Sequence, residues 1–430
     1  MSNPGVTDAV LLAIQRDLFE YFRAHTDPAT GLVADSTQPG KPCSIAAVGL
    51  ALAAYPVAVE RNFMSRAEAA TRVLTTLRFF HDSPHGTERN ATGYRGFYYH
   101  FLHMKTGQRA WKCELSTIDT ALLLAGVLTA AQYFDRNETS ERAIRFLADA
   151  LYRRADWQWA QNGGATVAMA WKPGKGFLRH RWQGYNEALI LYTLGLGSPT
   201  YPLPAESYTA WSATYKWKKI YGQELLFAGP LFIHQLSHLW IDLRGIRDEF
   251  MRAKGIDYFE NSRRAAYLQR EYSRRNPRGC TGYDDHTWGF TASEGPGKLV
   301  RKVAGRSRRF FPYKGRGAPY GPDDGTIALW CAAASLPFAP EIVLPIIEKV
   351  SHGDEAWKLT TTFNPTFPAR GGKGWISPWQ YGINLGPLLL MIENYRSGLL
   401  WRLMRENPYL SLGLHRAGFR GGWLGDGFSE

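Results

Sequence analysis

The chain has 430 residues, of which 45% are hydrophobic and 14% aromatic, and its formal net charge is +13. This composition excludes a disordered or fibrous protein, and the length suffices for one large domain or two smaller ones. No apolar stretch reaches the roughly 18 residues that span a membrane, and the run from Ala9 to Ile14 lacks the basic start of an export signal. We therefore expect no membrane partner and a cytoplasmic protein, or a periplasmic one if the sequence is a processed form.

The spacing of the cysteines and histidines predicts no metal site. The cysteines are far apart and show no redox motif, so we expect free buried thiols in a reducing compartment at Cys43, Cys113, Cys280 and Cys331. His234 and His238 have the i, i+4 spacing of metal ligands, but no acid lies between them. We expect neither a metal nor another cofactor.

Part of the positive charge gathers in the basic segment from Arg263 to Arg309, where arginine and lysine recur in short clusters. No helix-turn-helix, zinc-finger or RNA-binding motif accompanies these clusters, so we expect no nucleic acid partner. Two interpretations remain open: solvated helix faces, or a surface that attracts anionic substrates.

Apolar residues recur with a helical period along most of the chain. In chain order, the pattern predicts helices over residues 6–24, 44–54, 65–80, 116–133, 140–152, 187–192, 227–243, 245–275, 325–334, 340–350 and 384–403. The loops between them are long and rich in glycine and aromatic residues, and Trp157 and Trp159 fall in one of them. Because no convincing series of strands appears, we expect a single all-α domain of helical hairpins over residues 1–430.

An aromatic segment with glycine at its turns runs from Gly93 to Phe101 and includes Tyr94 and His100. It is typical of a loop that lines a pocket, and equally of a short strand pair that closes one end of a helical core. The two interpretations are compatible. The 15 Trp, 22 Tyr and 22 Phe of the chain exceed what a core alone needs, and rings that stack on sugar faces are one use for the surplus.

The chain is organised around residues 113–126, where two acids and two hydroxyl residues precede a long apolar run. Ser116 or Thr117 is suited to cap the helix that follows, with Asp119 at the third position of a capping box for Ser116. If Glu114 lies just outside this helix and Asp119 in its first turn, both carboxyl groups project from the same end. A capping box beside one exposed acid is the alternative.

A second acid, Glu187, begins another apolar helix in the same way, after a glycine and an aromatic residue. A helix N-terminus favours the ionised carboxylate, so a proton-donating Glu187 needs desolvation or a neighbouring acid to raise its pKa. The alternative is a first-turn acid that only interacts with the helix dipole.

Two later loops carry pairs of acids, Asp284-Asp285 and Asp323-Asp324, and the first loop continues with Trp288 and Glu294. Such pairs serve as calcium ligands, catalytic acids or acceptors for sugar hydroxyls, or they only form turns and helix caps. Among the functional uses we favour sugar contact, because aromatic residues lie near both pairs.

Several motifs, in order along the chain, resemble the glucoamylase-like domain family, which includes the bacterial endo-β-1,2-glucanases of glycoside hydrolase family 144 and a domain of cyclic β-1,2-glucan synthases. They are Glu-Leu-Ser-Thr-Ile-Asp-Thr-Ala-Leu-Leu-Leu-Ala-Gly at 114–126, Gly-Tyr-Asn-Glu-Ala at 184–188, Leu-Gly-Ser-Pro-Thr at 196–200, Asp-Asp-Gly-Thr-Ile at 323–327, Ser-Leu-Pro-Phe-Ala-Pro-Glu at 335–341 and Ile-Glu-Asn-Tyr-Arg at 392–396. The resemblance implies an (α/α)6 toroid, a six-hairpin barrel with its site in a cleft at one end. It maps the proton donor onto Glu187 and candidate acids onto Glu114 and Asp119.

The function that we expect is hydrolysis of β-1,2-glucan to short oligosaccharides by general acid-base catalysis. In it, Glu187 protonates the departing glycosidic oxygen, while Asp119 or Glu114 activates water directly or through a relay. The predicted sugar-binding residues are Tyr185, Trp182, Tyr94, His100, Asp285, Trp288, Glu294 and Asp324. A transglycosylase that acts on the same glucan and a glycan-binding protein without turnover are the alternatives.

Overall fold

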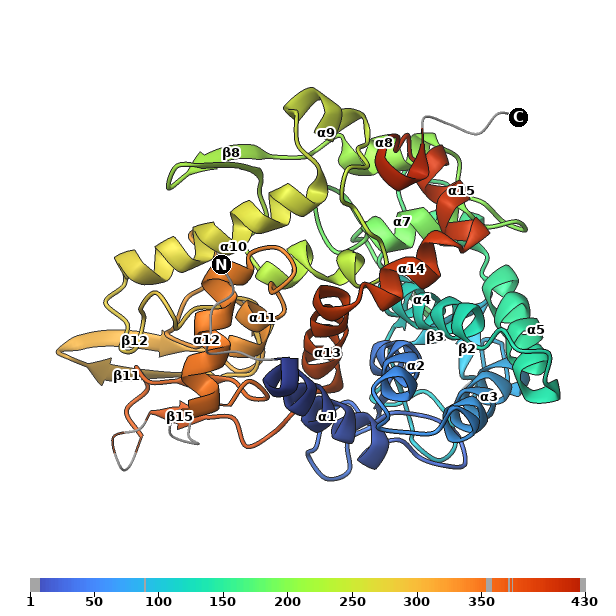
Figure 1. Cartoon of the computed structure of the whole chain (residues 1–430), viewed down its shortest axis with the longest axis horizontal. Coiled ribbons are helices and arrows are strands. Elements are labelled where there is room, and N and C mark those ends of the chain that lie inside the picture. Colours follow the sequence, from blue (N-terminus) through green and yellow to red (C-terminus); the bar gives the residue numbers. More distant parts are fainter. Residues whose placement is uncertain (1–7, 89, 353–357, 370–371, 373, 426–430) are drawn as a thin grey trace.

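The computed structural model describes residues 8–88, 90–352, 358–369, 372 and 374–425, and it shows a helix-rich molecule (Figure 1). In the first part of the chain the helices are α1 (Asp8–Ala24), α2 (Ile45–Glu60), α3 (Arg66–Asp82), α4 (Thr117–Tyr133), α5 (Thr139–Arg154), α6 (Trp157–Gln161), α7 (Leu189–Leu196) and α8 (Glu206–Ser212). They continue with α9 (Glu249–Lys254), α10 (Tyr258–Arg275), α11 (Leu329–Ala333), α12 (Pro340–His352), α13 (Gly382–Arg396), α14 (Leu399–Arg405) and α15 (Pro408–Arg416). None of the described helices is long and apolar enough to cross a membrane.

Four helices, α2, α4, α7 and α13, are buried on almost every side and form the centre of the core. They contact one another in turn, α13 with α2, α2 with α4 and α4 with α7. The closest approach joins α2 and α4, where a Cβ on Gly126 would lie 2.0 Å from the carbonyl oxygen of Gly49. Because only glycine lacks that atom, the small residues of these two helices allow their backbones to touch.

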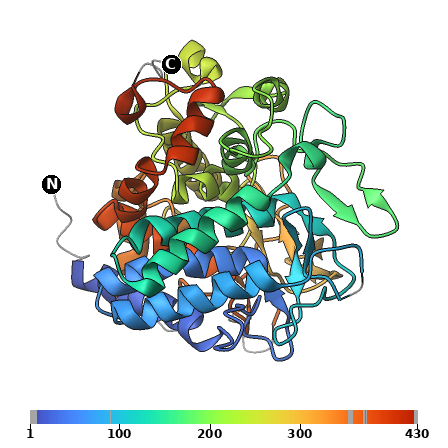
Figure 2. The ribbon, with the colours of Figure 1, turned by 90° about the vertical axis from the view of Figure 1, so that its right-hand side faces the viewer.

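An outer layer of helices covers this centre. In α5 the buried side chains, among them Ile144 and Leu151, lie on one face, as expected for a helix between core and solvent. The outer helices α1, α3 and α5 contact α13, α2 and α4 respectively, and α15 contacts α7. Figure 2 shows α3 and α5 side by side on the surface, where they also contact each other.

Most predicted helices form, but several have different limits. Residues 6 and 7 of the first prediction lie outside the described residues. The prediction over 227–243 is wrong, because two short 3-10 helices, η1 (Leu231–His234) and η2 (Leu236–Leu239), form there. A third 3-10 helix, η3 (Gly422–Leu424), lies near the C-terminus.

Two predicted helices are each divided in two. The predicted helix 245–275 forms α9 and α10, and 384–403 forms α13 and α14, since Gly255 and Gly398 adopt left-handed conformations at the breaks. The predicted loop at Trp157 and Trp159 is the short helix α6.

The expectation of no strand series is also wrong. A five-stranded antiparallel sheet has the order β2 (Gly93–Tyr94), β3 (Phe97–Tyr99), β5 (Leu115–Ser116), β6 (Ala170–Lys172), β7 (Gly176–Phe177). Five strand pairs complete the described strands: β1 (Cys43–Ser44) with β4 (Phe101–Leu102), β8 (Trp217–Ile220) with β9 (Gln223–Leu226), β10 (Ala292–Ser293) with β13 (Lys314–Gly315), β11 (Leu299–Val303) with β12 (Arg306–Phe310), and β14 (Phe363–Asn364) with β15 (Trp375–Ile376). Strands of two to five residues are too short to show an alternating pattern in the sequence.

The aromatic segment 93–101 contains one of these strand pairs. β2 and β3 form a hairpin in which Gly93 pairs with Tyr98, so the strand-pair interpretation of this segment is confirmed. β3 then pairs with β5, which places Tyr99 opposite Leu115 directly before α4. The sheet thereby fixes the backbone of His100 and Glu114 beside the start of the central helix, where the backbone N–H of His100 donates to the carbonyl of Glu114.

Candidate active site

A cavity of about 480 Å³ lies where several buried helices begin. Its walls include residues at the N-terminal ends of these helices: Ser44 before α2, Asp119 in α4, Glu187 before α7, Trp330 in α11, and Ile383 and Asn384 in α13. Helix N-termini carry partial positive charge and unpaired N–H groups, which favours acidic groups and polar ligands at such a mouth. The volume is that of an ordinary small-molecule site.

Asp119 is held at the start of α4 by the predicted cap. Ser116 is the N-cap residue, and its Oγ accepts a hydrogen bond from the backbone N–H of Asp119 at 3.2 Å. The same hydroxyl donates to Oδ2 of Asp119 at 2.5 Å. The carboxylate thus has a fixed orientation, and it faces the cavity as a hydrogen-bond acceptor.

His100 links Asp119 to Glu114. Its Nδ1 lies 3.0 Å from Oε1 of Glu114, and its Nε2 lies 3.6 Å from Oδ2 of Asp119. Burial lowers the pKa of His100, but the carboxylates of Asp119, Glu114 and Asp35 outweigh it and raise this pKa to about 9. The imidazole is therefore a cation at neutral pH, and it lies between two carboxylates.

Glu114 itself is absent from the cavity wall. The hydrogen bond from His100 lowers the pKa of Glu114 to about 2, although burial opposes this shift, and Lys172 Nζ lies 3.9 Å away. Glu114 is therefore ionised, and its contact with the cavity runs through His100.

Glu187 lies just before α7 and lines the same cavity. Burial is the main cause that raises the pKa of Glu187 to about 7, and the charge of Asp119 adds to it, while a backbone N–H opposes the shift. From the sequence we expect a proton-donating Glu187 to need desolvation or a neighbouring acid, and here both raise its pKa. At neutral pH a substantial fraction of this carboxyl group carries a proton.

Asp35 is a third acid of the cavity, and sequence reasoning missed it. It lies in the connection between α1 and α2, where its backbone is fixed by hydrogen bonds with Pro42 and Gly382. Burial raises the pKa of Asp35 to about 6, against the opposing charges of His100 and Lys41. Nothing in the sequence distinguishes this aspartate from the turn residues that surround it.

The aromatic walls of the cavity also differ from the predicted ones. Trp111, Tyr313 and Tyr381 line it, and the first two are 57% and 50% exposed. The Nζ of Lys41 lies 5.0 Å from the centroid of the Trp111 ring. Exposed rings on the wall of a cavity are suited to stack against the faces of sugars.

Four aromatic residues of the predicted sugar site lie outside the cavity wall. Trp182 is buried and donates from Nε1 to Oγ1 of Thr117, and Trp288 is fully buried. Tyr185 packs against the rings of Tyr215, His234 and Tyr258, while Tyr94 stacks on Trp171.

The three later acids of the prediction also lie outside it. Asp324 is buried and forms an ion pair with Arg316 at 2.8 Å, which lowers its pKa against the effect of burial. Asp285 pairs with Arg270 at 3.3 Å, and Glu294 accepts a hydrogen bond from Ser377. Of the eleven predicted site residues, the structure brings Glu187, Asp119 and His100 together on the cavity wall, with Glu114 behind them.

Within the described ranges, no group of three or more His, Cys, Asp or Glu side chains is placed to hold a metal ion. The cysteines named above are all free and buried. The wall of the cavity presents carboxyl groups, the imidazolium of His100 and aromatic rings.

The chain is similar in sequence and fold to several known proteins. A curated relative from Parabacteroides distasonis, an exo β-1,2-glucooligosaccharide sophorohydrolase (non-reducing end), is 27% identical over 96% of this chain, which spans only 58% of that relative. A crystal structure named a "putative glucoamylase" from Bacteroides uniformis is 30% identical, with a TM-score of 0.85 over 97% of this chain and 99% of that one. The endo-β-1,2-glucanase of Chitinophaga pinensis, in complex with sophorotriose and glucose, is 25% identical, with a TM-score of 0.84 and the same coverage. The model of the family described as "Glycoamylase: Putative glucoamylase" matches residues 179–408, more than half of the chain, and the chain belongs to this family.

Proposed function

We propose that the protein is a glycoside hydrolase that cleaves β-1,2-glucan into short oligosaccharides by general acid-base catalysis. Relatives of similar fold are named as hydrolases of β-1,2-linked glucans and glucooligosaccharides. The observation that carries the proposal is one cavity that holds Glu187, with a pKa of about 7, together with the oriented carboxylate of Asp119. Two carboxyl groups in such different surroundings are typical of an acid and a base that act on one bond.

The arrangement of inner and outer helices supports an (α/α)6 toroid as the architecture of this hydrolase. The buried helices α13, α2, α4 and α7 contact one another in turn, and outer helices cover them. A toroid of this kind gathers the starts of its inner helices at one end. The cavity lies at such a set of helix starts.

In the proposed reaction, the neutral form of Glu187 donates its proton to the glycosidic oxygen as the bond to the anomeric carbon breaks. A pKa near 7 suits this role, because the carboxyl group is still protonated in part at neutral pH and still acidic enough to donate. After the products leave, Asp119 releases to solvent the proton that it took from the attacking water, and Glu187 takes up a proton from solvent, which restores both groups.

Asp119 is the proposed general base, because it lies on the cavity wall whereas Glu114 does not. Its carboxylate accepts a proton from the water that attacks the anomeric carbon. The hydroxyl of Ser116 and the imidazolium of His100 fix its orientation, and Glu114 acts as a positioning residue through His100.

A panel of linear β-1,2-, β-1,3- and β-1,4-glucans tests the substrate class. We expect new reducing ends from the β-1,2-linked polymer alone, and inversion at the first product anomer, by proton NMR, if water attacks directly. Cleavage of another linkage with β-1,2-glucan untouched would contradict the substrate. Longer or cyclic products would indicate a transglycosylase, and tight binding without new reducing ends a glycan-binding protein.

A further inference from the structure

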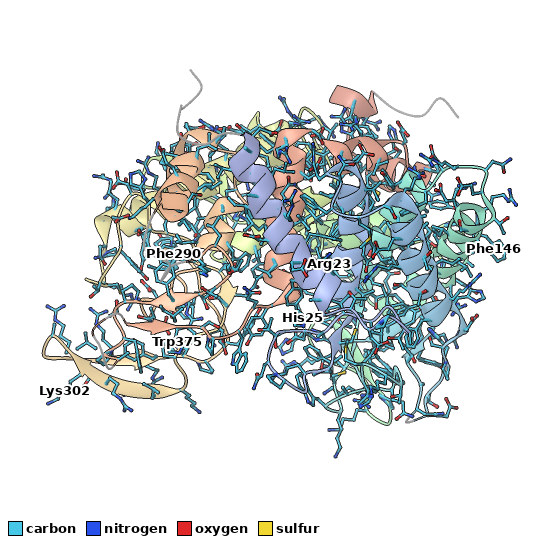
Figure 3. All side chains as sticks on the ribbon, turned by 60° about the horizontal axis from the view of Figure 1, so that its bottom comes forward. Arg23, His25, Phe146, Phe290, Lys302 and Trp375 are labelled. Atoms are coloured by element: carbon cyan, nitrogen blue, oxygen red, sulfur yellow. The ribbon has the colours of Figure 1, made fainter. Side chains whose placement is uncertain are left out.

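One part of the basic segment stands out from the body of the molecule. The hairpin of β11 and β12 projects at the side of α10 and α12 in Figure 1, and Figure 3 shows Lys302 near its free end. Between Glu294 and Asp323 the sequence contains no acid. Six basic residues of this stretch are exposed: Lys298, Arg301, Lys302, Arg306, Arg309 and Lys314.

The structure separates these cations from the rest of the basic segment. On α10, the five arginines all have acidic partners: Arg263 with Glu341, Arg264 with Glu260, Arg270 with Asp285, and Arg274 and Arg275 with Glu271. None of the six exposed cations of the hairpin region forms an ion pair with another described residue. The solvated-face interpretation of the basic segment therefore fits α10, and it leaves the hairpin unexplained.

The geometry of the hairpin keeps its charges close together. Arg301 lies directly opposite Arg308 across the two strands, and Arg309 lies opposite Val300, which is 53% exposed. Like charges in cross-strand pairs destabilise a hairpin, so this element loses stability unless an anion neutralises them. Arg308 is itself fixed, because its Nη2 donates to the carbonyls of Arg278 and Gly279, and this anchors the hairpin to the end of α10.

The hairpin is also continuous with the wall of the cavity. Ala292 of β10 lines the cavity before the hairpin, and Tyr313 lines it after the hairpin, where β10 pairs with β13. A polymer that leaves the cavity past the exposed ring of Tyr313 would meet the root of the hairpin first. Of the anionic partners that exposed cations attract, a substituted substrate chain is the one that this continuity favours.

We propose that the β11–β12 hairpin binds anionic groups, free carboxylates or phosphate esters, carried by the glucan chain that occupies the cavity. The inference rests on the proposed function, since it extends the substrate from a neutral to an acidic glucan. The exposed cations contact the anionic groups of the bound glucan chain. Arg308 anchors the hairpin and does not itself bind these groups. The attraction is electrostatic and falls as salt rises.

The test measures binding by isothermal titration calorimetry in proteins that also carry Glu187→Gln, because this substitution slows hydrolysis of the ligand and is expected to leave glucan affinity unchanged. The ligands are linear β-1,2-glucan and the same glucan after succinylation, at low and at high salt. The hairpin variant combines Arg301→Gln, Lys302→Gln, Arg306→Gln and Arg309→Gln. Its matched control makes the same charge change on α10, with Arg264→Gln, Arg270→Gln, Arg274→Gln and Arg275→Gln.

We expect the protein with the native hairpin to bind the succinylated glucan about tenfold more tightly than the neutral one at low salt, and the difference to vanish in the hairpin variant and at high salt. The control should keep the difference. Equal affinity for both glucans, or an equal loss in both variants, would overturn the inference. So would binding to anionic phospholipid vesicles in place of the acidic glucan. If the native protein cleaves neither glucan but still shows the hairpin-dependent preference, the hydrolase proposal fails and this inference stands.

Discussion

At the scale of single residues, the cavity gives its two central carboxyl groups different surroundings. The Ser116 hydroxyl and the His100 imidazolium hold Asp119 from one side. At Glu187 burial dominates and raises the pKa of the side chain to about 7. Part of Glu187 therefore keeps its proton at neutral pH. This is the physical basis for its proposed role as the acid.

The first prediction concerns pH and turnover. Because only the protonated form of Glu187 donates, we expect kcat/KM on β-1,2-glucan to fall about tenfold per unit as the pH rises beyond its pKa of about 7. A pH–rate profile that extends well above neutrality measures this limb. A rate that stays constant through that range would place the proton donor elsewhere.

The second prediction concerns His100 and stability. Its pKa of about 9 lies above the unfolded value of about 6.5, so its attraction to the carboxylates stabilises the fold fully below pH 6.5 and is lost as the pH rises through about 9. We expect His100→Gln to lower the free energy of unfolding by about 1–2 kcal/mol at pH 6 and by little above pH 9. Urea unfolding at both pH values measures this difference.

His103→Gln is the matched control for this experiment, because His103 is exposed on the same stretch of chain. It should change stability little at either pH. An equal loss for His100→Gln at both pH values would show that the ring contributes through packing and that its charge does not matter.

The sequence predicted the residues of the site that act through local structure. The Ser116 cap with Asp119 in the first turn follows from spacing alone, and the structure confirms it. Asp35 was not predictable, because a turn of the chain brings it to the cavity and no motif marks it. Trp288 is conspicuous in its loop, yet its ring is fully buried, since a large apolar surface is as useful to the core as to a ligand.

At the scale of elements, the close contact of α2 and α4 positions the cavity, because both helices begin at its wall. The contact depends on the absence of side chains at Gly49 and Gly126. Any widening of it would move Ser44 relative to Asp119. The two glycines therefore connect helix packing to the geometry of the site.

The third prediction tests this contact. In Gly126→Ala, the new methyl group would lie 2.0 Å from the carbonyl oxygen of Gly49, so the helices must separate. We expect a loss of about 1–3 kcal/mol in the free energy of unfolding, although alanine favours a helix more than glycine does. Thermal or urea unfolding measures it, with Gly315→Ala as the control, because no atom lies within 4 Å of a Cβ there. A stable Gly126→Ala protein would refute the tight packing of α2 on α4.

Elements with a long apolar period were predictable, and those fixed by tertiary contacts were not. α2, α4 and α5 carry their caps or amphipathic faces in the sequence. Residues 227–243 look helical by composition, yet they form only η1 and η2, and His238 is held there by the hydroxyl of Ser262 on another helix. Some of the short strands also pair with partners far along the chain, as β5 does with β6.

At the scale of the whole molecule, the cluster of exposed positive charge and the acids of the cavity occupy separate places. The carboxyl groups lie at the helix starts around the cavity, whereas Arg301, Lys302, Arg306 and Arg309 form a cluster of exposed cations on the β11–β12 hairpin. A net charge of +13 therefore does not describe the site itself. We expect ionic strength to change the affinity for acidic glucans through the hairpin, and we expect the proposed cleavage of neutral glucan not to depend on salt.

The most direct measurement of the central claim compares the native protein with Glu187→Gln on linear β-1,2-glucan, by counting new reducing ends over time and by measuring glucan affinity. Glu206→Gln, which changes an exposed acid of α8 outside the cavity wall, is the control. We predict that the native protein and the control release short oligosaccharides, and that Glu187→Gln binds glucan equally but turns over about 10² to 10⁴ times more slowly. Near-normal turnover by Glu187→Gln would contradict the account.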